Sequence, residues 1–326
     1  MSARPLLFAV AALPMSLIAC GGGDEDEVII PEGEHYHYVM DKLIVPLTPT
    51  QATDMALDLG SKTSNDLDKT KDNKLGEGLA SLHTLSMFDL QEPIDTAVNK
   101  GEIVLLMDYQ TKDFINAAAS GMQVYLGDMP NPAPCADAND MTCGLHLKGT
   151  GMFGVSSMSP QDAKVAGKVV NGTFSGGPGN ITIPLAIAGS AIEFNLANAR
   201  VQLKGVDENG IMDGILAGLV READLPMLFP AVRDEIKPFI MADCTLAGAP
   251  TDCGCEMNST GQLILDFLDT DPKDCEVALN EIQDNPTIKS ILSPDICIED
   301  SCDKPDGISI GVKVTAKKAM FTAPPM

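Results

Sequence analysis

The sequence contains no tryptophan and only 14 aromatic side chains among 326 residues, four tyrosines and ten phenylalanines. Basic residues are also scarce: 22 lysines and arginines stand against 46 aspartates and glutamates, for a formal net charge of −24. Proteins that bind nucleic acids neutralise phosphates with basic side chains and often stack bases on aromatic rings. The composition therefore argues against a nucleic-acid partner.

Long apolar runs are also missing, because none approaches the roughly 18 residues that a membrane-spanning helix needs. The longest apolar segment, Leu6–Ile18, follows Arg4 and is typical of a secretion signal. It runs into Leu17-Ile18-Ala19-Cys20, which resembles the lipobox of bacterial lipoproteins. The resemblance implies cleavage after residue 19 and attachment of lipid to Cys20. An ordinary secretion signal that happens to place a cysteine there is the alternative.

A flexible acidic tether is expected over residues 20–34. Three glycines, Gly21–Gly23, precede four consecutive acids, Asp24–Glu27, which anionic headgroups repel. Gly21 stands where an aspartate signals inner-membrane retention in well-studied lipoproteins. The expected partner is thus the outer membrane, reached through the N-terminal lipid; whether the protein faces the periplasm or the cell surface stays open.

Eight cysteines remain after Cys20, and an even number in an exported chain predicts four disulfides. Short acidic loops predict two pairs, Cys135–Cys143 and Cys297–Cys302. The other four are close in sequence, and a direct Cys253–Cys255 bond is disfavoured by its short span. These two cysteines are expected to pair with Cys244 and Cys275 in an order that the sequence leaves open. A zinc site built from the same four cysteines is the alternative.

The pattern of apolar residues predicts an α+β fold. Residues 35–143 alternate expected strands, such as 35–47 and 102–110, with short helices at 50–59, 78–88 and 92–99. Residues 144–220 hold short β-rich runs between glycine- and asparagine-rich breaks, among them Gly176–Gly179 and Asp207–Gly210. The Asn209-Gly210 pair is a strong hairpin signal. This region predicts an antiparallel meander. Residues 221–326 predict short helices among cysteine-rich loops, closed by one or two strands over 308–321.

Aspartate-rich loops raise the hypothesis of a calcium site. The best candidate ligands are Asp269, Asp271, Asp274 and Glu281. The spacing departs from the EF-hand pattern, because Lys273 and Asp274 stand at positions five and six and Asn280 stands at position twelve. No cofactor is therefore expected, with calcium as the alternative.

Other motifs give no catalytic signature. Gly149–Gly154 matches GxGxxG, but no helix is expected after it, so a bent glycine-rich strand is the better interpretation. His35 and His37 share one face of an expected strand and could ligate a metal, although a surface strand near the tether explains them more simply. No GxSxG or HExxH is present. The chain is therefore not expected to be an enzyme.

Short segments spread over the chain resemble uncharacterised lipoproteins of myxobacteria and their relatives. These segments are Asp72–Gly76, Asp213–Gly218, Pro294-Asp295 and Pro305–Val312. The resemblance implies a cell-envelope lipoprotein and brings no known activity. The expected function is a structural or binding role at the envelope. The first alternative is an apolar-ligand carrier that uses the meander and the helix near Met227-Leu228-Phe229, and the second is a hydrolase with a carboxylate site.

Overall fold

The computed structural model describes residues 29–60, 71–84, 91–135, 140, 142–187, 190–245, 252–270, 272–299 and 302–323. The signal segment, Cys20 and most of the tether lie outside the described residues, as does Asp271.

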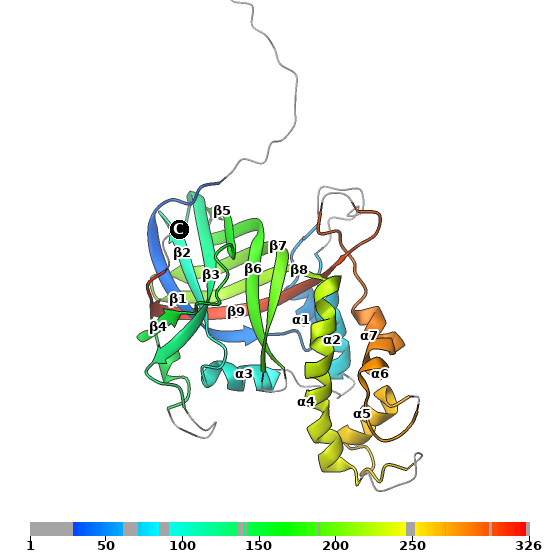
Figure 1. Cartoon of the computed structure of the whole chain (residues 1–326). Coiled ribbons are helices and arrows are strands. Elements are labelled where there is room, and N and C mark those ends of the chain that lie inside the picture. Colours follow the sequence, from blue (N-terminus) through cyan, green and yellow to red (C-terminus); the bar gives the residue numbers. More distant parts are fainter. Residues whose placement is uncertain are drawn as a thin grey trace, which may run out of the picture.

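Eight antiparallel strands close into a β-barrel (Figure 1). Each strand pairs with the next along the chain, and the last pairs with the first through Tyr38–Ile44 and Lys313–Lys318. The fold is α+β, as the sequence predicts. The strands are β1 (Glu34–Ile44), β2 (Leu105–Thr111), β3 (Ala117–Asn131), β5 (Lys164–Val170), β6 (Thr173–Ile187), β7 (Ser190–Asp207), β8 (Gly210–Arg221) and β9 (Gly307–Met320).

The sheet joins regions that the sequence analysis separates. Strands β1 to β3 come from the 35–143 region, yet they pair with strands of the 144–220 meander and with β9 in one continuous sheet. The short strand β4 (Gly151–Val155) carries the end of the GxGxxG motif and pairs with β3 and β9 outside the closed ring. No helix follows it at the position that a nucleotide-binding fold requires.

One turn of the meander lies where the sequence predicts it, and another lies elsewhere. The Asn209-Gly210 hairpin is present, with Asp207 accepting hydrogen bonds from both backbone amides at 2.7 and 3.1 Å. In contrast, Gly176–Gly179 forms no turn: β6 continues through it with a shift in register. The β5–β6 turn lies instead at Asn171 and Gly172, whose positive φ angles of 51° and 75° suit a tight hairpin.

Large side chains fill the barrel interior. Tyr109 on β2 contacts Phe174 on β6 with ring centroids 5.3 Å apart, although β3 and β5 separate these strands in the sheet. The Tyr38 hydroxyl on β1 likewise donates to the Asp207 carbonyl at the end of β7, at 2.7 Å. Such contacts between non-neighbouring strands cross the inside of the barrel, and all three rings are almost fully buried.

Helices cover one side of the barrel (Figure 1). Three short helices come from the first third of the chain: α1 (Pro49–Asp54), α2 (Lys74–Thr84) and α3 (Gln91–Asn99). The expected helix over 50–59 is shorter than predicted, because it ends at Asp54. The remaining helices are η2 (Glu222–Met227), α4 (Leu228–Asp243), α5 (Thr260–Leu268), α6 (Leu279–Asp284) and α7 (Pro286–Ile291). No helix in the described ranges is long and apolar enough to cross a membrane.

Helices α4 to α7 form a layer with its own small core, which we call the helical layer. Its buried centre is made by side chains of several helices, among them Ile236, Ile240, Ile264, Leu265 and Ile282. Two disulfides, Cys244–Cys255 and Cys253–Cys275, connect its loops and settle the order that the sequence left open. The four cysteines are paired as disulfides, so none is a thiolate that could hold zinc.

The two remaining bridges are those that short loops predict, Cys135–Cys143 and Cys297–Cys302. Disulfides persist in oxidising compartments and are rare in the cytosol. The four bridges therefore indicate an exported protein.

Candidate functional site

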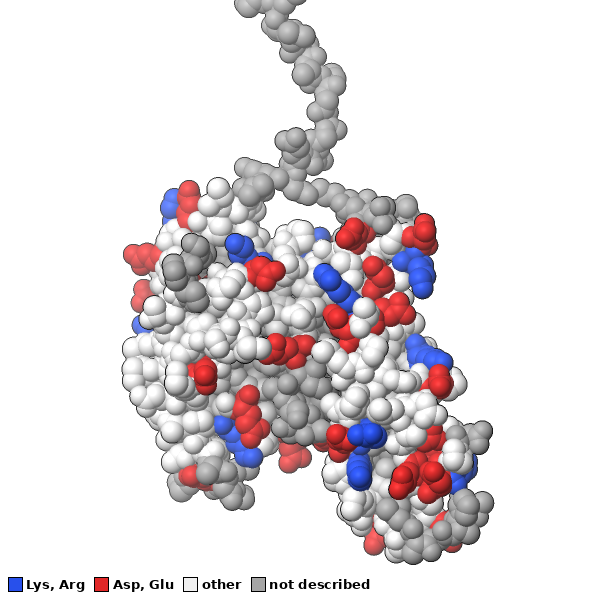
Figure 2. All heavy atoms as spheres, in the orientation of Figure 1, with Lys and Arg blue, Asp and Glu red and all other residues white. Residues whose placement is uncertain are grey.

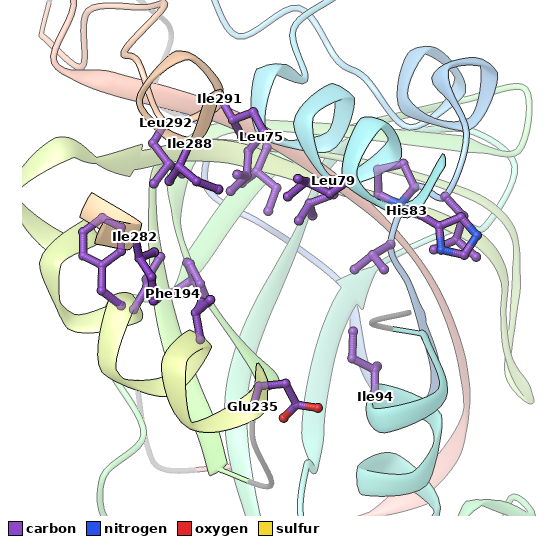
Figure 3. A pocket seen from close by; sticks show the side chains of 18 of the residues that line it. Leu75, Leu79, His83, Ile94, Phe194, Glu235, Ile282, Ile288, Ile291 and Leu292 are labelled. Carbon is purple, nitrogen blue, oxygen red and sulfur yellow. The ribbon is translucent and has the colours of Figure 1, made fainter. Parts of the chain in front are cut away.

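An apolar pocket of about 150 Å³ lies between the barrel and the helices (Figure 3). Nineteen residues line it, and seventeen of them are aliphatic, phenylalanine or proline. The two polar exceptions are His83 and Glu235. Pockets of this composition exclude water and favour apolar ligands.

Helix α2 forms one wall. Leu75, Leu79 and Leu82 line the pocket, and their spacing places them along one face of the helix. Asn73, buried just before the helix, holds this wall against the barrel: its side chain accepts from the Gly311 amide at 2.8 Å and donates to the Ala52 carbonyl at 2.9 Å. The start of α2 is thereby fixed to β9.

A second buried group also attaches α2 to β9. The Lys74 amide donates to the Ser309 hydroxyl at 2.8 Å, and Asp295 accepts from the Ser309 amide at 2.8 Å and from its hydroxyl at 2.5 Å. Burial raises the pKa of Asp295, and the hydrogen bonds from Ser309 oppose this effect. This network makes the α2 wall rigid.

Helix α4 forms the opposite wall. Leu228, Phe229 and Val232 line the pocket, while the neighbouring Met227 is 58% exposed. Two of the three residues named in the sequence-based carrier hypothesis therefore face the pocket. Glu235, one turn beyond Val232, places its carboxylate toward Ile94 on the far side of the pocket (Figure 3).

Helices α6 and α7 complete the enclosure. Ile282, Ile288 and Ile291 line the pocket. Helix α7 packs very closely on α2 at Gly78, where an added Cβ would come within 2.2 Å of the Ile291 side chain. From the barrel, Phe194 of β7 and Ile310 of β9 supply the floor.

The calcium candidates lie in the loops that hold α5 and α6 together. Asp269 accepts from the backbone amides of Asp274 and Cys275 at 3.2 and 2.9 Å, and Glu281 accepts from those of Thr270 and Ala278 at 2.7 and 2.9 Å. Burial raises the pKa of Asp269, against the effect of its two amide donors. These carboxylates organise the loop from within, an arrangement that gives no support to calcium binding.

One group of potential metal ligands is compact. Cys253, Asp269 and Cys275 place three ligand atoms within 4.8 Å of one another, and among the described residues no other trio does so. The two cysteines are bonded to each other, so this group offers no thiolate to a metal.

The His35 and His37 pair lies elsewhere, on the side of β1 that faces away from the barrel interior. The Nδ1 atom of His35 lies 2.9 Å from the Asp108 carboxylate on β2. His37 stacks on Phe321 with ring centroids 4.3 Å apart. Both histidines share one face of a strand, as the sequence predicts, and both lie far from the apolar pocket in the fold.

The protein as a whole is acidic, with a formal net charge of −24. Figure 2 shows aspartate and glutamate side chains scattered over a face made mostly of other residues, with lysine and arginine less frequent. The potential around the pocket is therefore unfavourable to anionic ligands.

No protein-family model matches the chain, and searches of curated proteins and of solved structures also give no significant match.

The sequence predicts an apolar binding surface at α4, but it does not predict that α2 and α7 line the same pocket. The missed residues carry a local signal, since Leu75, Leu79 and Leu82 recur at helical spacing and so do Ile288 and Ile291. That signal predicts one apolar face on each helix. It does not reveal that two such faces meet with a gap between them, because the gap depends on how separate layers pack.

Proposed function

We propose that the chain is a lipid-anchored protein of the bacterial envelope that binds a small apolar molecule, or the end of an acyl chain, between its barrel and its helical layer. The observation that carries the proposal is the pocket of about 150 Å³ with an almost entirely apolar lining. The closed barrel is compatible with this role. Because large side chains fill the barrel interior, the site that we propose lies outside the ring of strands.

The size of the pocket restricts the ligand class. A cavity of roughly this volume lined by leucine, isoleucine and phenylalanine stays dry and takes a ligand about the size of benzene. A complete diacyl lipid does not fit in that space. A single ring, or the terminal carbons of one chain whose polar end stays in solvent, does fit.

The envelope location comes from the N-terminal sequence. Cys20 in its lipobox predicts a lipid anchor, and the acidic tether predicts a body held away from the headgroups. Attachment to the outer membrane is part of the proposal. In that position the protein would meet apolar molecules that leave or enter the bilayer. The role is one of binding, with no catalytic step.

The absence of tryptophan gives a direct test. The variant Phe229→Trp places a single indole in the pocket wall, and Phe239→Trp places one on the same helix at a site that is 43% exposed. Octanol, which has a short chain and no charge, is titrated against both variants while tryptophan emission is recorded. We expect a saturable blue shift for Phe229→Trp and none for Phe239→Trp.

The native chain provides an independent measurement. Calorimetric titration of the wild-type protein with octanol checks that the indole itself does not create the site. Absence of saturable binding in wild type, or equal spectral changes in both variants, would contradict the proposed function.

A further inference from the structure

A second cluster of polar side chains lies on the outer surface of the barrel, across three neighbouring strands. His37 on β1, Asp108 on β2 and Gln123 on β3 are paired in register, so their side chains stand in one row on one face of the sheet. His35 lies two residues before His37 on the same face, and Tyr125 lies two residues after Gln123.

Both histidines contact the same carboxylate oxygen. The Nδ1 atom of His35 lies 2.9 Å from Oδ1 of Asp108, and Nε2 of His37 lies 3.7 Å from the same atom. Asp108 is only 5% exposed. Within the described part of the chain no lysine or arginine forms an ion pair with it. A buried carboxylate without a fixed positive partner is costly, so this oxygen favours a cation.

Two further polar atoms beside the row have no hydrogen-bond partner among the residues that the structure describes. The Tyr125 hydroxyl and Oε1 of Gln123 are both buried and unpaired. Burial and, second, the nearby Asp108 raise the pKa of Tyr125 to about 12, so the hydroxyl stays protonated at neutral pH. Buried polar groups in native proteins nearly always have partners, and these two are free to bond a bound water.

We propose that His35, His37 and Asp108 bind one divalent transition-metal ion of the zinc class. Two imidazole nitrogens and one carboxylate oxygen form a ligand set that zinc accepts, and a water molecule would complete a tetrahedral site. The unpaired Gln123 oxygen and Tyr125 hydroxyl belong to the same face of the sheet and are the groups that we expect to bond that water. Imidazole ligands select zinc-class metals over calcium, which prefers oxygen.

The distances between the ligand atoms are close to those found around a tetrahedral zinc ion. Ligand atoms around a tetrahedral zinc with bonds of about 2.1 Å are about 3.4 Å apart, and the two nitrogen-to-oxygen distances of 2.9 and 3.7 Å lie on either side of that value. The three ligand atoms do not yet lie within 4.8 Å of one another, so binding requires one imidazole to turn. His35 can do so because it is 39% exposed, whereas stacking on Phe321 holds His37 in place.

The test uses the full mature chain without a polyhistidine tag, after treatment with EDTA. Zinc chloride is titrated calorimetrically, and cobalt(II) is titrated while visible absorption is recorded, because tetrahedral cobalt gives an intense ligand-field band. Wild type is expected to bind one zinc ion and to show this band. His35→Ala and Asp108→Asn should each weaken zinc binding at least about tenfold, since each removes one ligand. The control His83→Ala, at the apolar pocket, should bind like wild type.

Three results would overturn the proposal. The first is the absence of one-to-one zinc binding in wild type, and the second is cobalt binding without the tetrahedral band. The third is a zinc affinity that stays unchanged in both His35→Ala and Asp108→Asn. If Asp108→Asn does not fold, His35→Ala still decides the matter, because it keeps the buried carboxylate and truncates a side chain that is 39% exposed.

Discussion

The barrel interior and the interface between barrel and helices are both apolar, but the first is filled and the second is hollow. Inside the barrel, Tyr38, Tyr109 and Phe174 reach across to non-neighbouring strands. At the interface, leucines and isoleucines of α2, α4 and α7 surround an open volume of about 150 Å³.

The difference follows from how each core is built. A closed eight-stranded barrel has an interior just wide enough for its own side chains to fill. The interface joins the barrel to a helical layer that has its own core and its own two disulfides. Because the helical layer has a core and bridges of its own, its packing on the barrel need not be complete. A pocket is tolerated there at little cost to the fold.

The largest expected effect comes from removing a ring inside the barrel. Phe174→Ala should lower the free energy of unfolding by about 3–5 kcal/mol, since it leaves a new cavity in a filled core. Phe194→Ala is the matched substitution, because Phe194 is also a buried barrel phenylalanine but already borders the pocket. Its ring has fewer partners to lose, so its cost should be at least about 1 kcal/mol smaller. Urea denaturation measures both; equal costs would mean that the pocket is closed in solution.

The second largest effect is expected from removing the Cys253–Cys275 disulfide of the helical layer. Replacing Cys253 and Cys275 with serine removes a bridge between residues 22 apart, and should cost about 3 kcal/mol. The helical layer should loosen while the barrel keeps its β-sheet circular dichroism, and octanol binding should be lost. Replacing Cys135 and Cys143, which lie outside the pocket, is the control and should leave binding intact. Loss of binding in both double variants would show that the two bodies are not independent.

The filled core was easier to anticipate from the sequence than the hollow one. Alternation and the Asn209-Gly210 turn predict strands and an antiparallel meander, because both depend on residues close in the chain. Barrel closure depends on β1 pairing with β9, where paired residues are 269 to 280 positions apart in the chain, and no local pattern encodes that pairing. The misplaced β5–β6 turn has a similar origin: Gly176–Gly179 looks like a break, yet neighbouring strands hold it in β6.

The candidate sites likewise contain some residues that the sequence reveals and others that it does not. Leu228 and Phe229 stand out in sequence as a concentrated apolar segment, and His35 and His37 stand out through their alternation. Asp108 carries no signal, because its relation to the histidines arises only when β1 and β2 pair. The calcium candidates show the opposite case, in which residues close in sequence suggest a site that the structure does not support. Their carboxylates accept hydrogen bonds from backbone amides of their own loop.

The third prediction concerns a substitution that fills the hollow core. Val232→Phe adds a ring to the pocket wall and should reduce octanol affinity at least about tenfold, while the free energy of unfolding changes by no more than about 1–3 kcal/mol. Met241→Phe, at a 61% exposed site on the same helix, is the control and should alter neither quantity. Calorimetric titration and urea denaturation give the two values. Unchanged affinity in Val232→Phe would place octanol somewhere other than this pocket.

The smallest expected effect concerns the charge at the pocket, where the hollow core meets solvent. Among the described residues, Glu235 is the only acidic one in the lining, and it forms no ion pair with another of them. Its carboxylate and the net charge of −24 should favour ligands with a cationic end. Octylammonium should therefore bind more tightly than octanol, and octanoate more weakly.

Glu235→Gln isolates the local part of this preference. An exposed charge pair contributes about 0.2–1 kcal/mol, so the variant should reduce the advantage of octylammonium over octanol by up to about fivefold. Octanol affinity should not change, because the amide has nearly the same size as the carboxylate. The same titrations at higher salt should weaken the remaining preference, since salt screens the charge of the whole protein. A preference that is unaffected by both Glu235→Gln and salt would show that the pocket selects by shape alone, with the ligand's polar end beyond the reach of Glu235.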